Sequence, residues 1–217
     1  KVADPRLISI IELRDKRGGA NSALRVALEY LYRTVGDKHL KRVIQTFYQK
    51  SIRDKEVEIE LKLTDQDLTD TDGTPIASEL DTDTNVITIN KNYLNTRALL
   101  HEIAHAYTHR AVKNGKLPAV KELKTLYKNT KEILGDVYGT VNIEEFIAEA
   151  FSNVAFRRQL AGINIKGETL NVLQKFTNVV RRILNATFER VGLDSRLTPS
   201  DALSQVDQLL NEIVPPI

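Results

Sequence analysis

The chain has no cysteine, no methionine and no tryptophan among its 217 residues. Without cysteine it can form neither a disulfide nor a thiolate zinc site, and it cannot use a thiol nucleophile. The 31 basic residues nearly balance the 29 acidic ones, for a net charge of +2, which gives no support for binding nucleic acid. No apolar run approaches the length of a membrane span, and residues 1–25 lack the apolar core of a signal peptide. We therefore expect no nucleic-acid partner and no membrane span.

The two ends of the sequence favour an origin in a longer polypeptide. The chain starts at Lys1 rather than at methionine, and its end, Val214-Pro215-Pro216-Ile217, is typical of the beginning of a linker. We therefore expect other parts of a parent polypeptide among its partners. At this length the chain can bury a substantial hydrophobic core of its own.

Hydrophobic periodicity divides the chain into helical and extended stretches. Residues 5–55 have helical spacing, and residues 57–63 alternate between apolar and polar as in a half-buried strand. Turn residues over 70–75 are followed by a predicted hairpin over 78–90. Further helices are predicted at about 96–114, 119–134, 143–160, 169–191 and 199–213. The pattern predicts an α+β fold with an N-terminal helical segment (1–55), a catalytic core (56–160) and a C-terminal helical segment (161–217) in one compact unit.

The sequence His101-Glu102-Ile103-Ala104-His105 is the motif that carries chemistry. On a helix, residues i and i+4 lie on one face, so the two imidazoles can converge on one metal ion. Glu102 lies about 100° around the helix, from where its carboxylate can reach a metal-activated water without binding the ion. A catalytic zinc site needs three protein ligands and one open position. The motif therefore predicts Zn²⁺ held by His101 and His105, with Glu102 as the catalytic base.

The third ligand decides the subclass of such a site. One known pattern has a further His six residues after the second and also a Met-turn. It is excluded here, because Ala111 stands at that position and the chain has no methionine. His109 lies about 80° around the helix from His101, so we expect it at the surface rather than on the metal.

Two acids downstream supply a better third ligand. Glu145 and Glu149 share a helix face beside an apolar stripe, where carboxylates need a positive partner. Glu145 is then the third ligand, and Glu149 is an acceptor that orients a ligating histidine. The alternative is an exposed acidic face paired with Arg157 or Arg158.

The run from Tyr138 to Phe151, YGTVNIEEFIAEAF, narrows the assignment. A His-Glu-x-x-His helix followed by a helix with Glu-x-x-x-Glu is the gluzincin pattern. The run closely resembles the active-site segment of the anthrax lethal factor family, and the region from about 85 to 160 is similar to zincin-like domains in large phage virion-associated polyproteins.

The resemblance implies a zincin-like fold, with a small, mostly antiparallel sheet packed on the active-site helix and extra helices at both ends. It implies zinc on His101, His105 and Glu145, Glu102 as base, and Tyr138 as the group that supports the oxyanion. An ordinary loop aromatic is the alternative for Tyr138. The glycines on either side, Gly135 and Gly139, predict a mobile loop that brings the ring in with substrate.

The function we expect from these residues is zinc-dependent endopeptidase activity on a peptide or protein substrate. Strand 86–90 is expected to offer an edge to which an extended peptide adds. The alternative is a non-catalytic, virion-associated structural or interaction protein that keeps a zincin scaffold. Glu102 favours the enzyme, because it contributes nothing to a purely structural metal site. A phage virion or a delivered effector is the expected setting.

Overall fold

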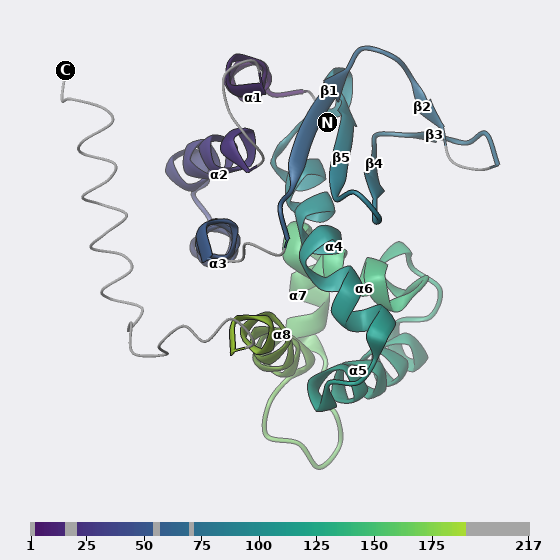
Figure 1. The fold of residues 1–217 in the computed structure, drawn as a ribbon. Coiled ribbons are helices and arrows are strands. Elements are labelled where there is room, and N and C mark those ends of the chain that lie inside the picture. The colour runs from purple at the N-terminus through teal and green to yellow at the C-terminus, as the bar shows by residue number, and fades with distance from the viewer. Residues whose placement is uncertain (1–2, 16–20, 54–56, 70–71, 190–217) are drawn as a thin grey trace. The chain divides into compact units, whose positions relative to one another are not determined.

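The computed structural model describes residues 3–15, 21–53, 57–69 and 72–189 (Figure 1). Residues 1–184 form one compact α+β unit; residues 185–217 lie outside it, and of these only the end of the last helix is described. The helix predicted at 199–213 lies outside the described residues. Within the described part of the chain, no helix combines the length and apolarity that a bilayer crossing requires.

The described residues between 5 and 53 are mostly helical, as predicted. They comprise α1 (Pro5–Asp15), α2 (Ser22–Thr34) and α3 (Lys38–Arg53), each packed on the next. Asp4 caps α1, because its side chain accepts hydrogen bonds from the backbone N–H groups of Arg6 and Leu7. The inward faces supply fully buried leucines and Phe47 to the hydrophobic core.

The main sheet has three strands in the order β1-β5-β4 (Figure 1). β4 (Ser78–Asp81) and β5 (Val86–Asn90) form the predicted antiparallel hairpin, and β1 (Glu60–Thr64) pairs with β5 in parallel. A separate antiparallel ladder joins β2 (Leu68–Thr69) and β3 (Pro75–Ile76). The expected mostly antiparallel sheet is therefore wrong, because this sheet is mixed. The expectation of an edge at strand 86–90 is wrong too, since β5 is the central strand and β4 lies at the edge.

Of the helices that follow the sheet, α4 makes the main contacts with it. A short 3₁₀ turn, η1 (Lys91–Tyr93), leads into α4 (Thr96–Asn114), which packs against β4, β5 and α6. The other elements are α5 (Pro118–Leu134), η2 (Tyr138–Thr140), α6 (Ile143–Ser152), α7 (Val154–Gly162) and α8 (Val172–Glu189).

The predicted single helix 143–160 is interrupted at Asn153. This residue has extended backbone angles (φ −104°, ψ 108°), and its side chain caps α7 by accepting from the N–H groups of Ala155 and Phe156. An asparagine side chain offers the backbone this alternative to helical hydrogen bonding. This break in the helix bears on the site, because the Asn153 side chain also donates a hydrogen bond to Glu149 of α6.

Candidate metal centre

Helix α4 presents both histidines of the motif on one face. Asn95 begins the helix, with its side chain accepting from the N–H groups of Arg97 and Ala98, and Gly115 ends it at a positive φ of 64°. Ile103 and Ala104, between the histidines in sequence, are fully buried against the core. This burial fixes the rotation of α4, so that His101 and His105 both line a cleft beside the sheet.

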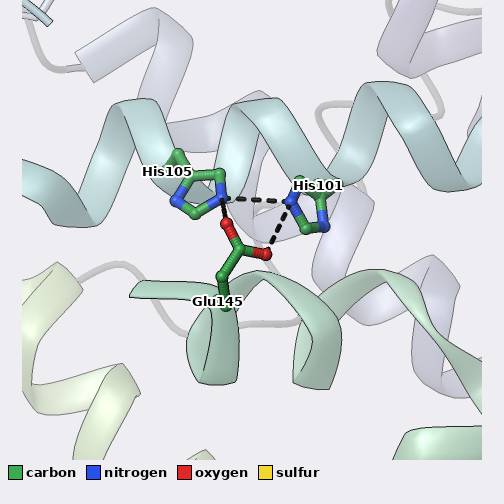
Figure 2. Close-up of side chains that lie close together, drawn as sticks. All are labelled: His101, His105 and Glu145. Carbon is green, nitrogen blue, oxygen red and sulfur yellow. Dashed lines mark hydrogen bonds and ion pairs between the residues drawn. The ribbon is translucent and has the colours of Figure 1, made fainter. Parts of the chain in front are cut away.

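Figure 2 shows Glu145 reaching from α6 towards the two imidazoles of α4. The Nε2 atoms of His101 and His105 are 3.1 Å apart. Oε2 of Glu145 lies 3.3 Å from Nε2 of His101, and Oε1 lies 3.3 Å from Nε2 of His105. Ligands at 2.0–2.2 Å from a tetrahedral zinc ion are about 3.3–3.6 Å apart. Each of these distances between neighbouring donor atoms is thus close to the spacing that such an ion requires, with the two histidines facing different oxygens of Glu145.

The charges of this donor triangle, Glu145, His101 and His105, are compatible with a bound cation. Oε2 of Glu145 is buried and has no hydrogen bond of good geometry, although it faces His101. Burial raises the pKa of Glu145, but its close contacts with His101 and His105 outweigh this and hold the pKa well below its usual range. Burial likewise lowers the pKa of His101, but Glu145, Glu149 and the charge of Glu102 raise it to about 9. In the metal-free protein a proton on His101 therefore balances the carboxylates, and a metal ion would replace it.

Glu149 lies behind His101, one helical turn from Glu145. It is 2% exposed, and its Oε1 is 3.4 Å from Nδ1 of His101. Nη2 of Arg97 donates to both carboxylate oxygens at 2.8 and 2.9 Å, and Nδ2 of Asn153 donates to Oε2 at 2.6 Å. Burial raises the pKa of Glu149, but the hydrogen bonds from His101, Arg97 and Asn153 lower it to about 2. Glu149 is thus held as a carboxylate that faces the back of the imidazole.

The exposed acidic face considered as an alternative for Glu149 is therefore wrong. Arg157 instead donates to the backbone oxygen of Phe151 and lies 3.9 Å from Asp37. Sequence reasoning missed Arg97 as the partner, although the spacing held a signal. Arg97, His101 and His105 recur every four residues on α4, opposite the same spacing of the two acids on α6.

Glu102 lies beside the donor triangle without joining it. The residue is 7% exposed and lines the cleft, and its Oε1 accepts a 2.7 Å hydrogen bond from the hydroxyl of Ser78 on β4. Ser78 is the second residue that sequence reasoning missed, because its contact depends on how the edge strand lies against α4.

Tyr138 stands in η2 at the rim of the cleft. Its ring centroid is 6.4 Å from that of His101, and 60% of the residue is exposed. Burial around the hydroxyl and the charge of Glu145 raise its pKa, so the phenol stays protonated and can donate a hydrogen bond.

The turn around Tyr138 makes close contacts with the core, while its movement on substrate binding stays a prediction. A Cβ on Gly139 would lie 2.6 Å from the ring of Phe156, so this glycine is needed for close packing. The hydroxyl of Thr140 donates to the backbone oxygen of Val137 at 2.9 Å, and that of Tyr127 donates to the backbone oxygen of Thr140 at 2.9 Å. The turn that carries Tyr138 is thus held against the core.

The last histidine of α4 stays outside the triangle. Nδ1 of His109 lies 3.4 Å from Oε1 of Glu144, at the next level of the α4–α6 interface. Among the described residues, His101, His105 and Glu145 are the group whose His and carboxylate donor atoms converge, all within 4.8 Å of one another.

These residues open onto a cleft of about 970 Å³ between β4 and the α4–α6 pair. Its lining includes the donor triangle together with Ser78, Leu80, Glu102 and Tyr138. The cleft is large enough for a short stretch of extended peptide. Comparisons of the chain with protein-family models, curated proteins and solved structures find no match.

Proposed function

We propose that the chain is a zinc-dependent endopeptidase. One observation carries the proposal: two imidazole nitrogens and the half-buried carboxylate of Glu145 meet at 3.1–3.3 Å, and the buried Oε2 of this carboxylate lacks a well-directed hydrogen bond. Such a cluster of partly desolvated polar groups is costly unless a cation completes it. The adjoining cleft and the buried acid of Glu102 favour a catalytic ion over a structural one.

In this proposal His101, His105 and Glu145 hold the ion, and Glu149 orients the imidazole of His101. When bound, zinc supplies Lewis-acid polarisation of the scissile carbonyl and makes water acidic enough to react near neutral pH. Glu102 accepts a proton from the attacking water as the water oxygen forms a bond with the carbonyl carbon. Glu102 later returns a proton to the amine as the C–N bond breaks. The Tyr138 hydroxyl donates a hydrogen bond to the oxygen on which negative charge develops.

The substrate would lie along the free edge of β4. The backbone oxygen of Ala77 accepts from the N–H of Asn90, so Ala77 turns its backbone groups towards β5. In an antiparallel pair the orientation alternates, so Ser78 and Leu80 turn theirs away from β5. In the described part of the chain no strand pairs with this side of β4. An extended peptide can add there as a further strand, which favours unfolded or loop segments as substrates.

The proposal is tested by metal analysis of the purified chain together with a cleavage profile on a proteome-derived peptide library. We expect one zinc per chain, cleavage that a chelator abolishes, and recovery when zinc is returned. Glu102→Gln should keep the zinc and lower kcat by several orders of magnitude, because it removes the proton acceptor and spares the ligands.

The control variant is His109→Gln, which alters a histidine of the same helix outside the donor triangle and should retain zinc. Stoichiometric zinc with no cleavage of any library peptide would favour the alternative, an interaction protein on a zincin scaffold. Zinc binding that survives Glu145→Ala unchanged would contradict the ligand set itself.

A further inference from the structure

The side chain of Ser78 joins the edge strand β4 to Glu102, the proposed catalytic base. Ser78 is the first residue of β4, and its hydroxyl donates to Oε1 of Glu102 at 2.7 Å across 24 residues of sequence. Among the described residues no other hydrogen bond to the Glu102 carboxylate is found, so its Oε2 has no hydrogen-bond partner there, and Glu102 lines the cleft. The contact therefore divides the carboxylate into an anchored oxygen and a free one.

We propose that Ser78 is a positioning residue for Glu102, and this inference rests on the proposed peptidase function. A carboxylate on a flexible glutamate side chain has several rotamers, and proton transfer needs one of them. The Ser78 hydrogen bond selects the rotamer in which Oε1 points to β4 and Oε2 remains available to the attacking water. A hydrogen bond to a charged acceptor is among the stronger side-chain contacts, so it can hold this rotamer.

The same residue also contacts the substrate in this arrangement. The backbone N–H and C=O of Ser78 turn outwards from the sheet edge, where an added peptide strand would pair with them. One residue thereby sets two positions, that of the peptide backbone through its main chain and that of the base through its hydroxyl. The scissile bond is then placed relative to Glu102 by a single rigid strand rather than by two independent loops.

The side chain and the main chain of Ser78 can be separated by mutation. Ser78→Ala removes the hydroxyl and keeps the backbone pairing, so kcat should fall about 10- to 100-fold while KM changes less than about 2-fold. Ser78→Thr keeps the hydroxyl and should restore kcat to within about 3-fold of the starting protein. The control is Thr88→Ala on β5. Thr88 pairs with Glu79, so its side chain lies on the other face of the sheet from that of Ser78, and its loss should leave kcat unchanged.

A structural measurement tests the same inference without activity. In crystals of the metal-free protein we expect one conformation of the Glu102 side chain, and in metal-free Ser78→Ala we expect two or more. A single, unmoved Glu102 conformation in Ser78→Ala would overturn the inference, whether or not the protein cleaves any substrate. Full kcat in Ser78→Ala, with Glu102→Gln inactive, would also overturn it while leaving the peptidase proposal intact.

Discussion

Replacing Arg97 with methionine should weaken both the fold and the metal site, through Glu149. The guanidinium contacts both oxygens of a carboxylate whose side chain is 3% exposed. A hydrogen bond to a charged group is worth about 1.5–3 kcal/mol, and one nitrogen makes both contacts, so we count them as one such bond. The Arg97 side chain is 38% exposed, and solvent screening reduces its contribution. We expect the free energy of unfolding to fall by about 1.5–2 kcal/mol.

The effect on zinc should be separable from the effect on stability. Without Arg97 the carboxylate of Glu149 keeps Asn153 and His101 as partners but becomes easier to protonate and to rotate. Loss of such a supporting group typically costs about 10- to 100-fold in metal affinity. Urea unfolding of the metal-free protein gives the first quantity, and competition with a chromophoric chelator gives the second.

Arg110→Met is the matched control. Arg110 is an exposed arginine on the same helix, and no acid lies within salt-bridge distance of it among the described residues. It should change neither the unfolding free energy nor the zinc affinity. Should Arg97→Met behave like Arg110→Met in both assays, the role assigned to the Arg97–Glu149 pair is refuted. A loss of stability with unchanged zinc affinity would leave Arg97 as a purely structural residue.

Three further predictions concern the rim, the core and the pH response of the site. Tyr138→Phe should lower kcat by about two to three decades with zinc affinity unchanged, and a loss under threefold would contradict an oxyanion role. Gly139→Ala should cost about 1–3 kcal/mol of unfolding free energy in urea, because its Cβ meets the Phe156 ring, whereas Gly36→Ala has open space around it and serves as control. In metal-free protein the raised pKa of His101 contributes stability that is complete below about pH 6.5 and is lost as pH rises towards 9, on the order of 3 kcal/mol. Urea midpoints between pH 6 and 9 should show this decline, and zinc, which displaces the proton, should remove it; a flat profile without metal would contradict the assignment.

Local signals in the sequence predicted helix α4 well. Asn95 and Gly115 mark the ends of α4 by side-chain chemistry and backbone freedom that are visible in the sequence. The hairpin of β4 and β5 is equally local, since the two strands are joined by a short polar turn. The convergence of Glu145 on the histidines was predicted from its position beside the apolar stripe of its helix and from the resemblance of the 138–151 segment.

Contacts between distant segments could not be predicted in the same way. The parallel pairing of β1 with β5 depends on which strands meet after the helices pack, and alternation within a strand does not encode its neighbour. For this reason the sequence pattern predicts strand 86–90 at the edge of the sheet, whereas β5 lies at its centre. Arg97 and Glu149 are 52 residues apart, and only the packing of α4 on α6 brings them together.

The contact between Gly139 and Phe156 links the packing of the hydrophobic core to the position of the turn that carries Tyr138. The Phe156 ring also packs edge-on against Phe146, which in turn contacts Phe176 of α8. A substitution anywhere along this row of rings can therefore displace the turn that carries Tyr138. Attempts to repack the interior for higher thermal tolerance would alter the rim of the cleft at Tyr138 without changing a residue that lines the cleft. Directed-evolution libraries for this protein should hold Phe156 constant and seek stability in the N-terminal helices instead.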